Sequence, residues 1–400
     1  MSCFRSHCPQ VVDVDKLCPE LLFKDLASDL QIEKENLAFE EHDDFFLGKG
    51  GFGNVYRGQY VENDESVATH VAVKIYNFED QTLNAQEAFH DIRQEIFILS
   101  KLRDHKFIVG FIGFTLEPRL CALMELASHG CLKNSVLKED DNKKQPRNVV
   151  LDRVVLFRII KQLAHGLSFM HKRRIIHRDI KSDNILVFSL SPEADVNVKI
   201  SDFGTANFLA PIGMKVIAGT LGFMAPEMFD YSSTDEYTTK VDIYSFSMVI
   251  SEMITGRRPF HELQLPHQIP DALRRGERPA YSDIKKSLFG LLPLTELMIK
   301  MWPQENTKRP TAQEVLKQVQ NPAFQLLYGK RTLEVPQNPT FFCAVPSLSE
   351  LWVLCDDKKG SFKRFILSIV KRGLVAYETL APMYEANTLF VIIFAHSRKV

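Results

Sequence analysis

The segment His177-Arg178-Asp179-Ile180-Lys181-Ser182-Asp183-Asn184, followed further along the chain by Asp202-Phe203-Gly204, decides the fold. The Asp179 carboxylate can orient and deprotonate a hydroxyl group, and Lys181 adds a positive charge close to it. Asn184 and Asp202 offer the oxygen ligands that hold magnesium on ATP. These are the parts that phosphoryl transfer to a hydroxyl requires, so the two segments predict a phosphoryl-transfer site.

Two neighbours of Asp179 are of the right chemical type for the same step but are assigned other roles. Asp183 is its near rival as the base, but a place directly before Asn184 is typical of a turn or solvent-facing residue. His177 is expected to pack beneath Phe203 and to hold the backbone. Asp179 is therefore the predicted base.

The stretch from Asp202 to Ala225-Pro226-Glu227 contains two threonines of interest. The run 219–224 is typical of a loop that seats the substrate residue, and Thr220 within it is predicted to hydrogen-bond to Asp179 and Lys181. Thr205 is the weaker candidate for a phosphorylation site. Arg178, beside the base, is placed to clamp a phosphate group added to this stretch.

A glycine-rich run, Gly48-Lys49-Gly50-Gly51-Phe52-Gly53-Asn54-Val55, fits the pattern G-x-G-x-x-G-x-V. Glycines let the backbone turn sharply and approach phosphates closely. A dinucleotide-binding fingerprint should open a helix, whereas this run lies between two predicted strands, which favours a hairpin lid over ATP. No Walker-type P-loop occurs around this run, which excludes a GTPase site there.

Lys74 follows in Val71-Ala72-Val73-Lys74, where it can bind the α- and β-phosphates behind the lid. Such a lysine needs a carboxylate to fix it. Glu95 is the predicted partner because it lies beside apolar Ile96 on the helix expected over 84–103. Glu87 is the alternative, but it comes two helical turns too early.

Two further carboxylates have predicted scaffold roles. Glu227 is expected to be buried and to need a cation, for which Arg309 is the predicted partner. Asp242 begins an apolar helix and is predicted to bond the backbone around Arg178. Losing either is expected to disorder the site rather than change the substrate.

The pattern of elements predicts an α+β fold, with a small β-rich lobe before a larger helical lobe. Strand-type alternation dominates 41–130, helical periodicity runs from Leu151 and again over 241–320, and 196–200 reads as the strand that delivers Asp202. The charged stretch 136–150 contains Pro146 and is expected to be a loop. Helix-like spacing within 1–40 involves Leu21, Leu22, Phe23, Leu26 and Leu30.

Composition excludes several classes of protein. The chain has 400 residues and a net charge of −1, which argues against a general nucleic-acid-binding surface. Its 7 cysteines show no C-x-x-C spacing, which is typical of reduced cytosolic thiols and poor for a zinc site. No signal peptide or membrane-spanning run is visible.

After about residue 330 the sequence changes to short β-type runs separated by turn residues. These runs are 341–345, 351–355, 365–367 and 390–394. They are typical of a sheet module or of propeller blades, and the chain is expected to stop within that domain.

The whole set from Gly48 to Arg309 resembles a eukaryotic protein kinase of the tyrosine-kinase-like group. Flanking runs, among them 8–13, 37–53 and 124–130, resemble the Roco family of leucine-rich-repeat kinases. The resemblance implies a bilobal kinase domain over 41–320, with an N-lobe over 41–128 and a C-lobe over 129–320. It also implies a linker after an absent COR domain over 1–40 and a partial WD40-like β-propeller over 335–400.

The resemblance further implies the nucleotide site and the partners. Met124 would be the gatekeeper, and the hinge at Glu125–Ala127 would bond the adenine. The expected set for ATP is Gly48, Lys49, Gly50, Gly51, Phe52, Gly53, Val55, Ala72, Lys74, Met124, Glu125, Leu126, Ala127 and Leu186. Protein substrates, Rab-type small GTPases among them, are implied, together with dimerisation through absent domains and a cytoplasmic location with peripheral recruitment to membranes.

The sequence therefore predicts a serine/threonine protein kinase that uses ATP and Mg²⁺, with Asp179, Lys181, Lys74 and Glu95 as catalytic residues. Lys181, two residues after the base, is typical of serine/threonine specificity. Three alternatives remain: a scaffold that binds nucleotide without chemistry, a dual-specificity or tyrosine kinase, and an interaction module centred on 330–400.

Overall fold

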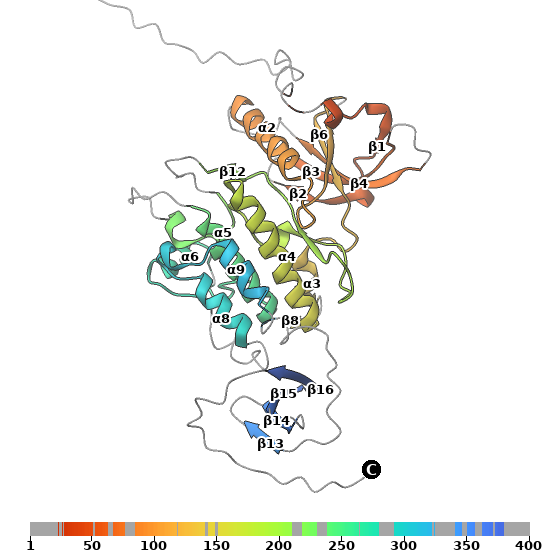
Figure 1. The fold of residues 1–400 in the computed structure, drawn as a ribbon. Helices are drawn as coiled ribbons and strands as arrows, with labels where there is room; N and C mark the ends of the chain where they lie inside the picture. The colour runs from red at the N-terminus through yellow and green to blue at the C-terminus, as the bar shows by residue number, and fades with distance from the viewer. Residues whose placement is uncertain are drawn as a thin grey trace, which may run out of the picture.

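The computed structural model describes most of the chain. The described residues are 23, 26, 28–50, 53–62, 67–76, 85–117, 119–140, 143–148, 151–209, 218–229, 238–263, 265–279, 292–321, 324, 341–345, 350–356, 362–370 and 373–379. A sheet-rich lobe carries one long helix, and a helical lobe follows it (Figure 1). This arrangement agrees with the predicted α+β class.

The first lobe is built on a six-stranded sheet in the order β1-β3-β4-β6-β5, with β2 paired to β3. The strands are β1 Leu37–Phe39, β2 Phe46–Gly50, β3 Gly53–Tyr60, β4 Thr69–Tyr76, β5 Phe111–Thr115 and β6 Cys121–Glu125. Leu37–Phe39, which the sequence placed in the linker, forms an edge strand against 58–60. The sheet therefore begins before the expected boundary at residue 41.

Strand β4 separates a hydrophobic layer from the face that holds the site. Val71, Val73 and Ile75 point into a small buried cluster on one side of the sheet. The residues between them, including Ala72 and Lys74, must face the other side because strand side chains alternate. Helix α2, Ala85–Leu102, is close to the helix expected over 84–103, and its buried Ile92, Ile96 and Leu99 form its packing face.

The second lobe is formed mainly by helices. These are α3 Leu132–Val136, α4 Arg153–Lys172, α5 Lys240–Thr255, α6 Gln268–Arg274, α8 Leu292–Met301 and α9 Ala312–Val319. Asp152 caps α4 by accepting hydrogen bonds from two backbone N–H groups, and Thr311 begins α9 with a capping box. Residues 241–254 of α5 are all buried, so this helix lies at the centre of the lobe.

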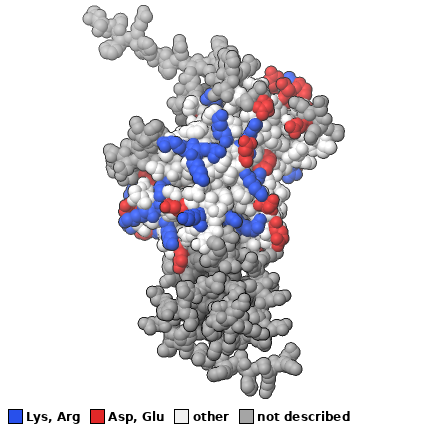
Figure 2. Space-filling view, viewed as in Figure 1, with Lys and Arg blue, Asp and Glu red and all other residues white. Residues whose placement is uncertain are grey.

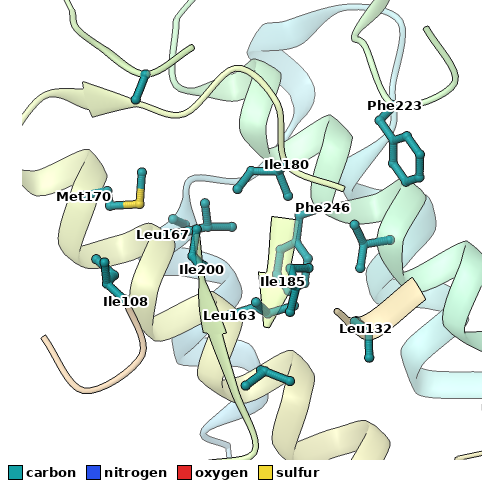
Figure 3. Close-up of a cluster of buried hydrophobic side chains, with 14 of the residues drawn as sticks. Ile108, Leu132, Leu163, Leu167, Met170, Ile180, Ile185, Ile200, Phe223 and Phe246 are labelled. Atoms are coloured by element: carbon teal, nitrogen blue, oxygen red, sulfur yellow. The ribbon is translucent and has the colours of Figure 1, made fainter. Parts of the chain in front are cut away.

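A hydrophobic cluster supports the catalytic segment from below. Leu163 and Leu167 of α4 lie near Ile180, Ile185 and Ile200 (Figure 3), and all of them are almost fully buried. Ile185 belongs to β10, Ile185–Val187, which pairs with β11, Val198–Ile200. This two-stranded ladder fixes the segments that follow Asn184 and precede Asp202.

The prediction of a loop over 136–150 is wrong for most of that stretch. β7, Leu137–Asp140, and β8, Lys143–Asn148, form an antiparallel pair with an irregular register. A proline is tolerated in such a two-stranded pair because its missing N–H can point away from the partner strand. The high charge of this stretch and Pro146 are typical of loops, and for this reason the sequence did not indicate the strand pair.

Four strands near the C-terminus form a separate antiparallel sheet in the order β13-β14-β15-β16. They are β13 Phe341–Val345, β14 Glu350–Asp356, β15 Phe362–Val370 and β16 Gly373–Thr379. The first three coincide with predicted runs, β16 was not predicted, and the run 390–394 lies outside the described residues. Of the five residues with helix-like spacing at 21–30, Leu21 and Leu22 also lie outside them, whereas Phe23, Leu26 and Leu30 are described, and Phe23 and Leu30 are buried.

The surface carries charges of both signs. Figure 2 shows Lys and Arg gathered on the face with β12, Asn207–Phe208, where Lys172, Arg173 and Arg174 are exposed at the end of α4. Within the described part of the chain, no helix combines the length and the apolar character that crossing a bilayer demands.

Candidate active site

A buried ion pair joins the sheet to helix α2. Lys74 Nζ lies 2.6 Å from Glu95 Oε1 and 3.4 Å from Asp202 Oδ1. Burial alone would lower the pKa of Lys74, but the two carboxylates outweigh it and raise that pKa, so Lys74 stays protonated. The predicted contact between Lys74 and Glu95 is confirmed. Gln94 also donates a hydrogen bond to the Ala206 carbonyl at 2.9 Å, which fastens α2 to the segment after Asp202.

The described part of the glycine-rich run lies at the end of β2 and the start of β3, where Gly50 pairs with Gly53, so it belongs to a hairpin as predicted. A Cβ atom on Gly50 would lie 3.3 Å from Lys74 Cε, so the lid passes close over that lysine. A Cβ on Gly53 would lie only 1.8 Å from the Ile75 carbonyl oxygen, which excludes any side chain there. Gly51 and Phe52, which belong to the expected nucleotide set, lie outside the described residues.

A cavity of about 310 Å³ opens under this lid, between the two lobes. Every described residue of the expected nucleotide set except Gly53 lines it. They are Gly48, Lys49, Gly50, Val55, Ala72, Lys74, Met124, Glu125, Leu126, Ala127 and Leu186, and the predicted metal ligands Asn184 and Asp202 line it too. The structure therefore brings residues from both lobes to one pocket.

The hinge between the lobes is held by Glu125. Its carboxylate lies 2.6 and 2.8 Å from Lys199 Nζ and accepts a hydrogen bond from the Gly110 N–H at 2.5 Å. The Glu125 N–H in turn donates to the Gly110 carbonyl at 2.9 Å. The Glu125 side chain and N–H are therefore occupied within the protein, which leaves the Glu125 carbonyl and the backbone of 126–127 as the groups suited to an adenine ring.

The predicted base is held by Lys181 and Thr220. Lys181 Nζ lies 2.7 Å from Asp179 Oδ2, and the Thr220 hydroxyl donates to Asp179 Oδ1 at 2.8 Å. Lys181 also donates to Thr220 Oγ1 at 2.8 Å, so the predicted contacts of Thr220 are confirmed. The two hydrogen bonds orient the Asp179 carboxylate, and the ammonium group of Lys181 balances its negative charge.

Asn184 and Asp202 form a donor set suited to magnesium. The Asn184 amide nitrogen donates to the Asp179 carbonyl at 2.9 Å and to Oδ2 at 3.1 Å, so its oxygen is the atom left for a metal. Burial favours a higher pKa for Asp202, but Lys74 and His177 hold that pKa below its usual value. An ionised carboxylate and an amide oxygen in one cavity fit a hard cation carried by phosphates.

Asp242 fixes the backbone of the catalytic segment. It is fully buried and accepts hydrogen bonds from the His177 N–H at 3.0 Å and the Arg178 N–H at 2.9 Å, as predicted. Arg178 has φ of 68° and Asp202 has φ of 58°, a left-handed conformation that costs free energy in residues other than glycine. A strained conformation of this kind persists only where surrounding contacts, such as those of Asp242, hold the backbone in place.

Two other sequence predictions concern the surroundings of the base. The ring of His177 packs 5.1 Å from that of Phe203, and its Nε2 lies 3.0 Å from the Ser201 carbonyl oxygen, in agreement with a structural role. Glu227 forms two contacts of 2.7 Å with the guanidinium of Arg309, whose side chain is fully buried. The structural role of His177 and the Glu227–Arg309 contact are confirmed, but Glu227 is only partly buried, with 19% of its side chain exposed.

Thr205 has a role that the sequence did not show. Its hydroxyl donates to the His177 carbonyl at 2.9 Å, and Arg178 Nε donates to its carbonyl oxygen. Arg178 Nη1 is buried and has no hydrogen-bond partner among the described residues. Thr205 is therefore part of the frame around the base, which disfavours it as a phosphorylation site.

The sequence also missed the surroundings of Asp183. This carboxylate lies 2.6 Å from Arg258 Nη2 and 3.4 Å from Lys133 Nζ, and its side chain is only 30% exposed. Of the two alternatives expected for Asp183, a turn or a solvent-facing residue, the turn is confirmed, since Ser182–Asn184 is a 3₁₀ turn. Arg258 is far away in the sequence, and no motif links the two positions.

Comparison with known proteins identifies relatives. The protein kinase domain family matches residues 42–319. Leucine-rich repeat serine/threonine-protein kinase 1 of Mus musculus is 35% identical over 95% of this chain and 19% of its own length. Serine/threonine-protein kinase STY46 of Arabidopsis thaliana is 31% identical over 68% of the chain and 43% of its own length. Probable serine/threonine-protein kinase roco5 of Dictyostelium discoideum is 30% identical over 75% of the chain and 10% of its own length.

The chain thus spans less than half the length of each of these relatives. Two of their names, a leucine-rich repeat kinase and a roco protein, agree with the resemblance found in the flanking runs. The continuation of the catalytic segment through Leu186 and Val187 resembles leucine-rich-repeat kinases of type one, and the mouse relative is of that type.

Proposed function

The chain belongs to the protein kinase family, and from this premise we propose that it is a serine/threonine protein kinase that transfers the γ-phosphoryl group of ATP to protein hydroxyls. One observation carries the proposal. Asp179, held by Lys181 and Thr220, is hydrogen-bonded to Asn184, which lines the same cavity as the Lys74–Glu95 pair. A nucleotide-binding scaffold would not need the oriented base.

The chemistry follows from these positions. The substrate hydroxyl oxygen forms a bond to the γ-phosphorus while the bond from that phosphorus to the bridging oxygen of ADP breaks, and the hydroxyl proton passes to Asp179. Lys74 holds the α- and β-phosphates, and Lys181 offsets negative charge beside the base. Magnesium, when bound with ATP, supplies further neutralisation of phosphate charge, and Asn184 and Asp202 would hold it.

The proposal of serine/threonine specificity rests on Lys181 and Thr220. Their contact of 2.8 Å closes the space above Asp179 with a short side chain and an ammonium group. This arrangement suits a hydroxyl carried on a short side chain. The names of the relatives, all serine/threonine kinases, support the same reading.

Three finer proposals rest on the resemblance to Roco-type kinases. The substrates include Rab-type small GTPases, the chain acts in the cytoplasm with peripheral recruitment to membranes, and dimerisation uses segments beyond those described. The sheet β13–β16 is proposed as part of a WD40-like propeller over 335–400, and the kinase domain is proposed to extend to about residue 320. The four antiparallel strands of this sheet have the order expected of one propeller blade.

A transfer assay tests the main proposal. The purified chain is incubated with γ-labelled ATP, magnesium and a generic protein substrate, and the labelled amino acid is identified. We expect phosphoserine and phosphothreonine, and loss of label in Asp179→Asn. Asp195→Asn is the matched control, because the Asp195 side chain is 93% exposed and lies outside the cavity.

Three results would contradict the proposal. Label transfer that survives Asp179→Asn would refute the base. Nucleotide binding by the wild type without transfer to any protein would favour the scaffold, and labelled phosphotyrosine would favour a tyrosine or dual-specificity kinase.

A further inference from the structure

A buried tyrosine adjoins the Lys74–Glu95 pair. Tyr76 comes two residues after Lys74 in β4, so the two side chains leave the strand on the same face. Only 2% of Tyr76 is exposed, and it belongs to the large hydrophobic cluster that includes Phe89 and Ile92 of α2. Lys74 Nζ lies 5.4 Å from the centre of the Tyr76 ring. Tyr76 is therefore placed beside the ion pair by the same strand that carries the lysine.

Two polar atoms of this group have no hydrogen-bond partner among the described residues. One is the Tyr76 hydroxyl, which can donate, and the other is Glu95 Oε2, which can accept. Both are buried, and a buried polar atom without a partner costs free energy. The two groups are close enough for each to shift the pKa of the other. The structure thus holds an unsatisfied donor next to an unsatisfied acceptor.

The protonation states of the two groups suit a hydrogen bond between them. Burial and the nearby Glu95 carboxylate raise the pKa of Tyr76 well above its ordinary value, so the phenol keeps its proton and can donate. Burial raises the pKa of Glu95, and Lys74 and the Tyr76 hydroxyl oppose that rise, so both neighbours favour the charged carboxylate. A hydrogen bond to a charged oxygen is stronger than one between neutral groups.

Glu95 needs a second contact to keep Lys74 in place. Lys74 Nζ lies 2.6 Å from Glu95 Oε1 and 3.4 Å from Asp202 Oδ1. A carboxylate held through one oxygen can turn about its side-chain bonds, and the lysine would move with it. A buried ion pair is stable only when further hydrogen bonds satisfy its remaining lone pairs. Tyr76 can supply that bond from a fixed position, because its backbone pairs with Gly53 of β3.

We propose that Tyr76 is a positioning residue for phosphoryl transfer: when nucleotide fills the cavity, its hydroxyl donates to Glu95 Oε2 and holds the carboxylate in the orientation that directs Lys74 to the α- and β-phosphates. This inference rests on the proposed kinase function. The Tyr76 ring adds a second contact, because an aromatic face attracts an ammonium group. Tyr76 does not line the cavity, so it acts on ATP only through Glu95 and Lys74.

A purely structural role for Tyr76 makes a different prediction. If the side chain only packed in the core, Tyr76→Phe would keep the ring and would leave nucleotide binding unchanged or weaken it as a whole. If the hydroxyl positions Lys74, its loss weakens the binding of phosphates and spares that of adenosine, which has none. The ratio of the affinities for ATP and adenosine therefore separates the two roles, since general damage to the cavity cancels in it.

The test measures the dissociation constants of ATP with magnesium and of adenosine by isothermal titration calorimetry. In Tyr76→Phe we expect the affinity for ATP to fall about tenfold, the scale of one hydrogen bond to a charged group, and the affinity for adenosine to stay within about twofold of the wild type. The kcat/KM for ATP in the transfer assay should fall by a similar factor. An unchanged ratio of affinities in folded Tyr76→Phe, or an equal loss for both ligands, would overturn the proposal.

Two further variants make the result specific. Tyr244→Phe is the matched control, because the Tyr244 hydroxyl is also buried without a partner among the described residues but lies in α5, in the second lobe. Its affinities for ATP and adenosine should both match the wild type. Tyr76→Leu removes the ring together with the hydroxyl, so it should lower the affinity for ATP at least as much as Tyr76→Phe.

A double variant shows whether Tyr76 acts through Glu95. In Glu95→Ala no carboxylate remains to accept the bond, so adding Tyr76→Phe should cause no further loss of affinity for ATP. A further loss of about tenfold would show that the hydroxyl acts elsewhere and would overturn the proposal. Glu95→Gln, which keeps the shape of the side chain, is measured in parallel in case the alanine variant does not fold, and there the further loss should be well below tenfold.

The affinity measurements need no phosphoryl transfer, so the two proposals fail in different ways. A failure of the proposed function would appear as an absence of label transfer by the wild type. A failure of this inference would appear as the same ratio of ATP to adenosine affinity in the wild type and in Tyr76→Phe.

Discussion

Lys74 Nζ and Glu95 Oε1 lie 2.6 Å apart, and neither side chain exposes more than 4% of its surface. This contact joins a strand of the sheet to helix α2 directly behind the glycine-rich lid. Because Lys74 also lies 3.4 Å from Asp202, the position of α2 determines the position of the charge nearest the proposed metal ligands. The pair therefore positions Lys74 for its contact with Asp202 of the second lobe.

Replacing Glu95 by glutamine should reduce transfer while leaving the fold intact. Glutamine keeps the shape and a hydrogen bond but loses the charge that fixes Lys74, so we expect kcat/KM to fall by about 100-fold, near 3 kcal/mol. The measurement is steady-state transfer at several ATP concentrations, with circular dichroism as the folding control. Activity within twofold of the wild type would refute this role of the pair.

Thr220 should contribute mainly to kcat. Thr220→Val removes the hydroxyl that donates to Asp179 at 2.8 Å but keeps the shape of the side chain. Because Thr220 does not line the nucleotide cavity, we expect kcat to fall by about tenfold or more with the KM for ATP unchanged. Thr220→Ser keeps the hydroxyl and should restore most of the rate. An equal loss in both variants would contradict the hydrogen-bond explanation.

The Glu227–Arg309 pair should be a large contributor to stability. Arg309→Met leaves the Glu227 carboxylate, whose side chain is 19% exposed, without its fully buried cation, and we expect a cost of about 3 kcal/mol, the lower end of the range for breaking a buried pair. Thermal unfolding should show a clear fall in Tm. Arg274→Ala, which removes a pair with Asp271 in which both side chains are more than half exposed, should change stability by less than about 1 kcal/mol. Equal shifts for both variants would contradict this account.

The stability of the protein should depend on pH through Glu252. The pKa of Glu252 in the fold is about 7, above its ordinary value of 4.5, because the carboxylate is buried. The folded state then holds a proton that the unfolded state releases, so the stability from this group is present at low pH and is lost as pH rises from about 4.5 through 7. Glu252→Gln should therefore become more stable relative to the wild type between pH 5 and 8, by at most about 3 kcal/mol. Parallel Tm curves for the two proteins would contradict the prediction.

The two threonines near the base should carry no phosphate in the active protein. The Thr205 hydroxyl donates to the His177 carbonyl, and the Thr220 hydroxyl donates to Asp179. A phosphate on either would break that bond and, on Thr220, would place negative charge against the base. Mass spectrometry of active protein is the check. Stoichiometric phosphate on either residue would show that the segment adopts a second arrangement.

The sequence predicted the catalytic constellation because its members have fixed spacing. Asp179, Lys181 and Asn184 lie close together in the sequence, so their residue types and their order are enough to indicate phosphoryl transfer. The Lys74–Glu95 contact was also predictable, since strand alternation and helix periodicity each leave few candidate faces. Such predictions succeed because the geometry of a strand, a helix or a short segment follows directly from the local sequence.

Contacts between distant segments were harder to predict. Arg258 and Asp183 meet only because α5 ends beside the catalytic segment, and nothing in either local sequence indicates the other. The β7–β8 pair was missed because backbone hydrogen bonds outweighed an unfavourable composition. Leu37–Phe39 was assigned to a linker because a strand of three residues is too short for alternation to be visible.

Helix α5 holds the catalytic segment at two points. Asp242 in its first turn binds the backbone at His177 and Arg178, and Glu252 in its last turn reaches Ser182 and Asp183 through Arg258. Both ends of the segment 177–184 are thus held by α5, a helix that is buried on every side. Amide hydrogens of 177–184 should then exchange with solvent as slowly as those of α5 itself, even when the two lobes open to admit nucleotide.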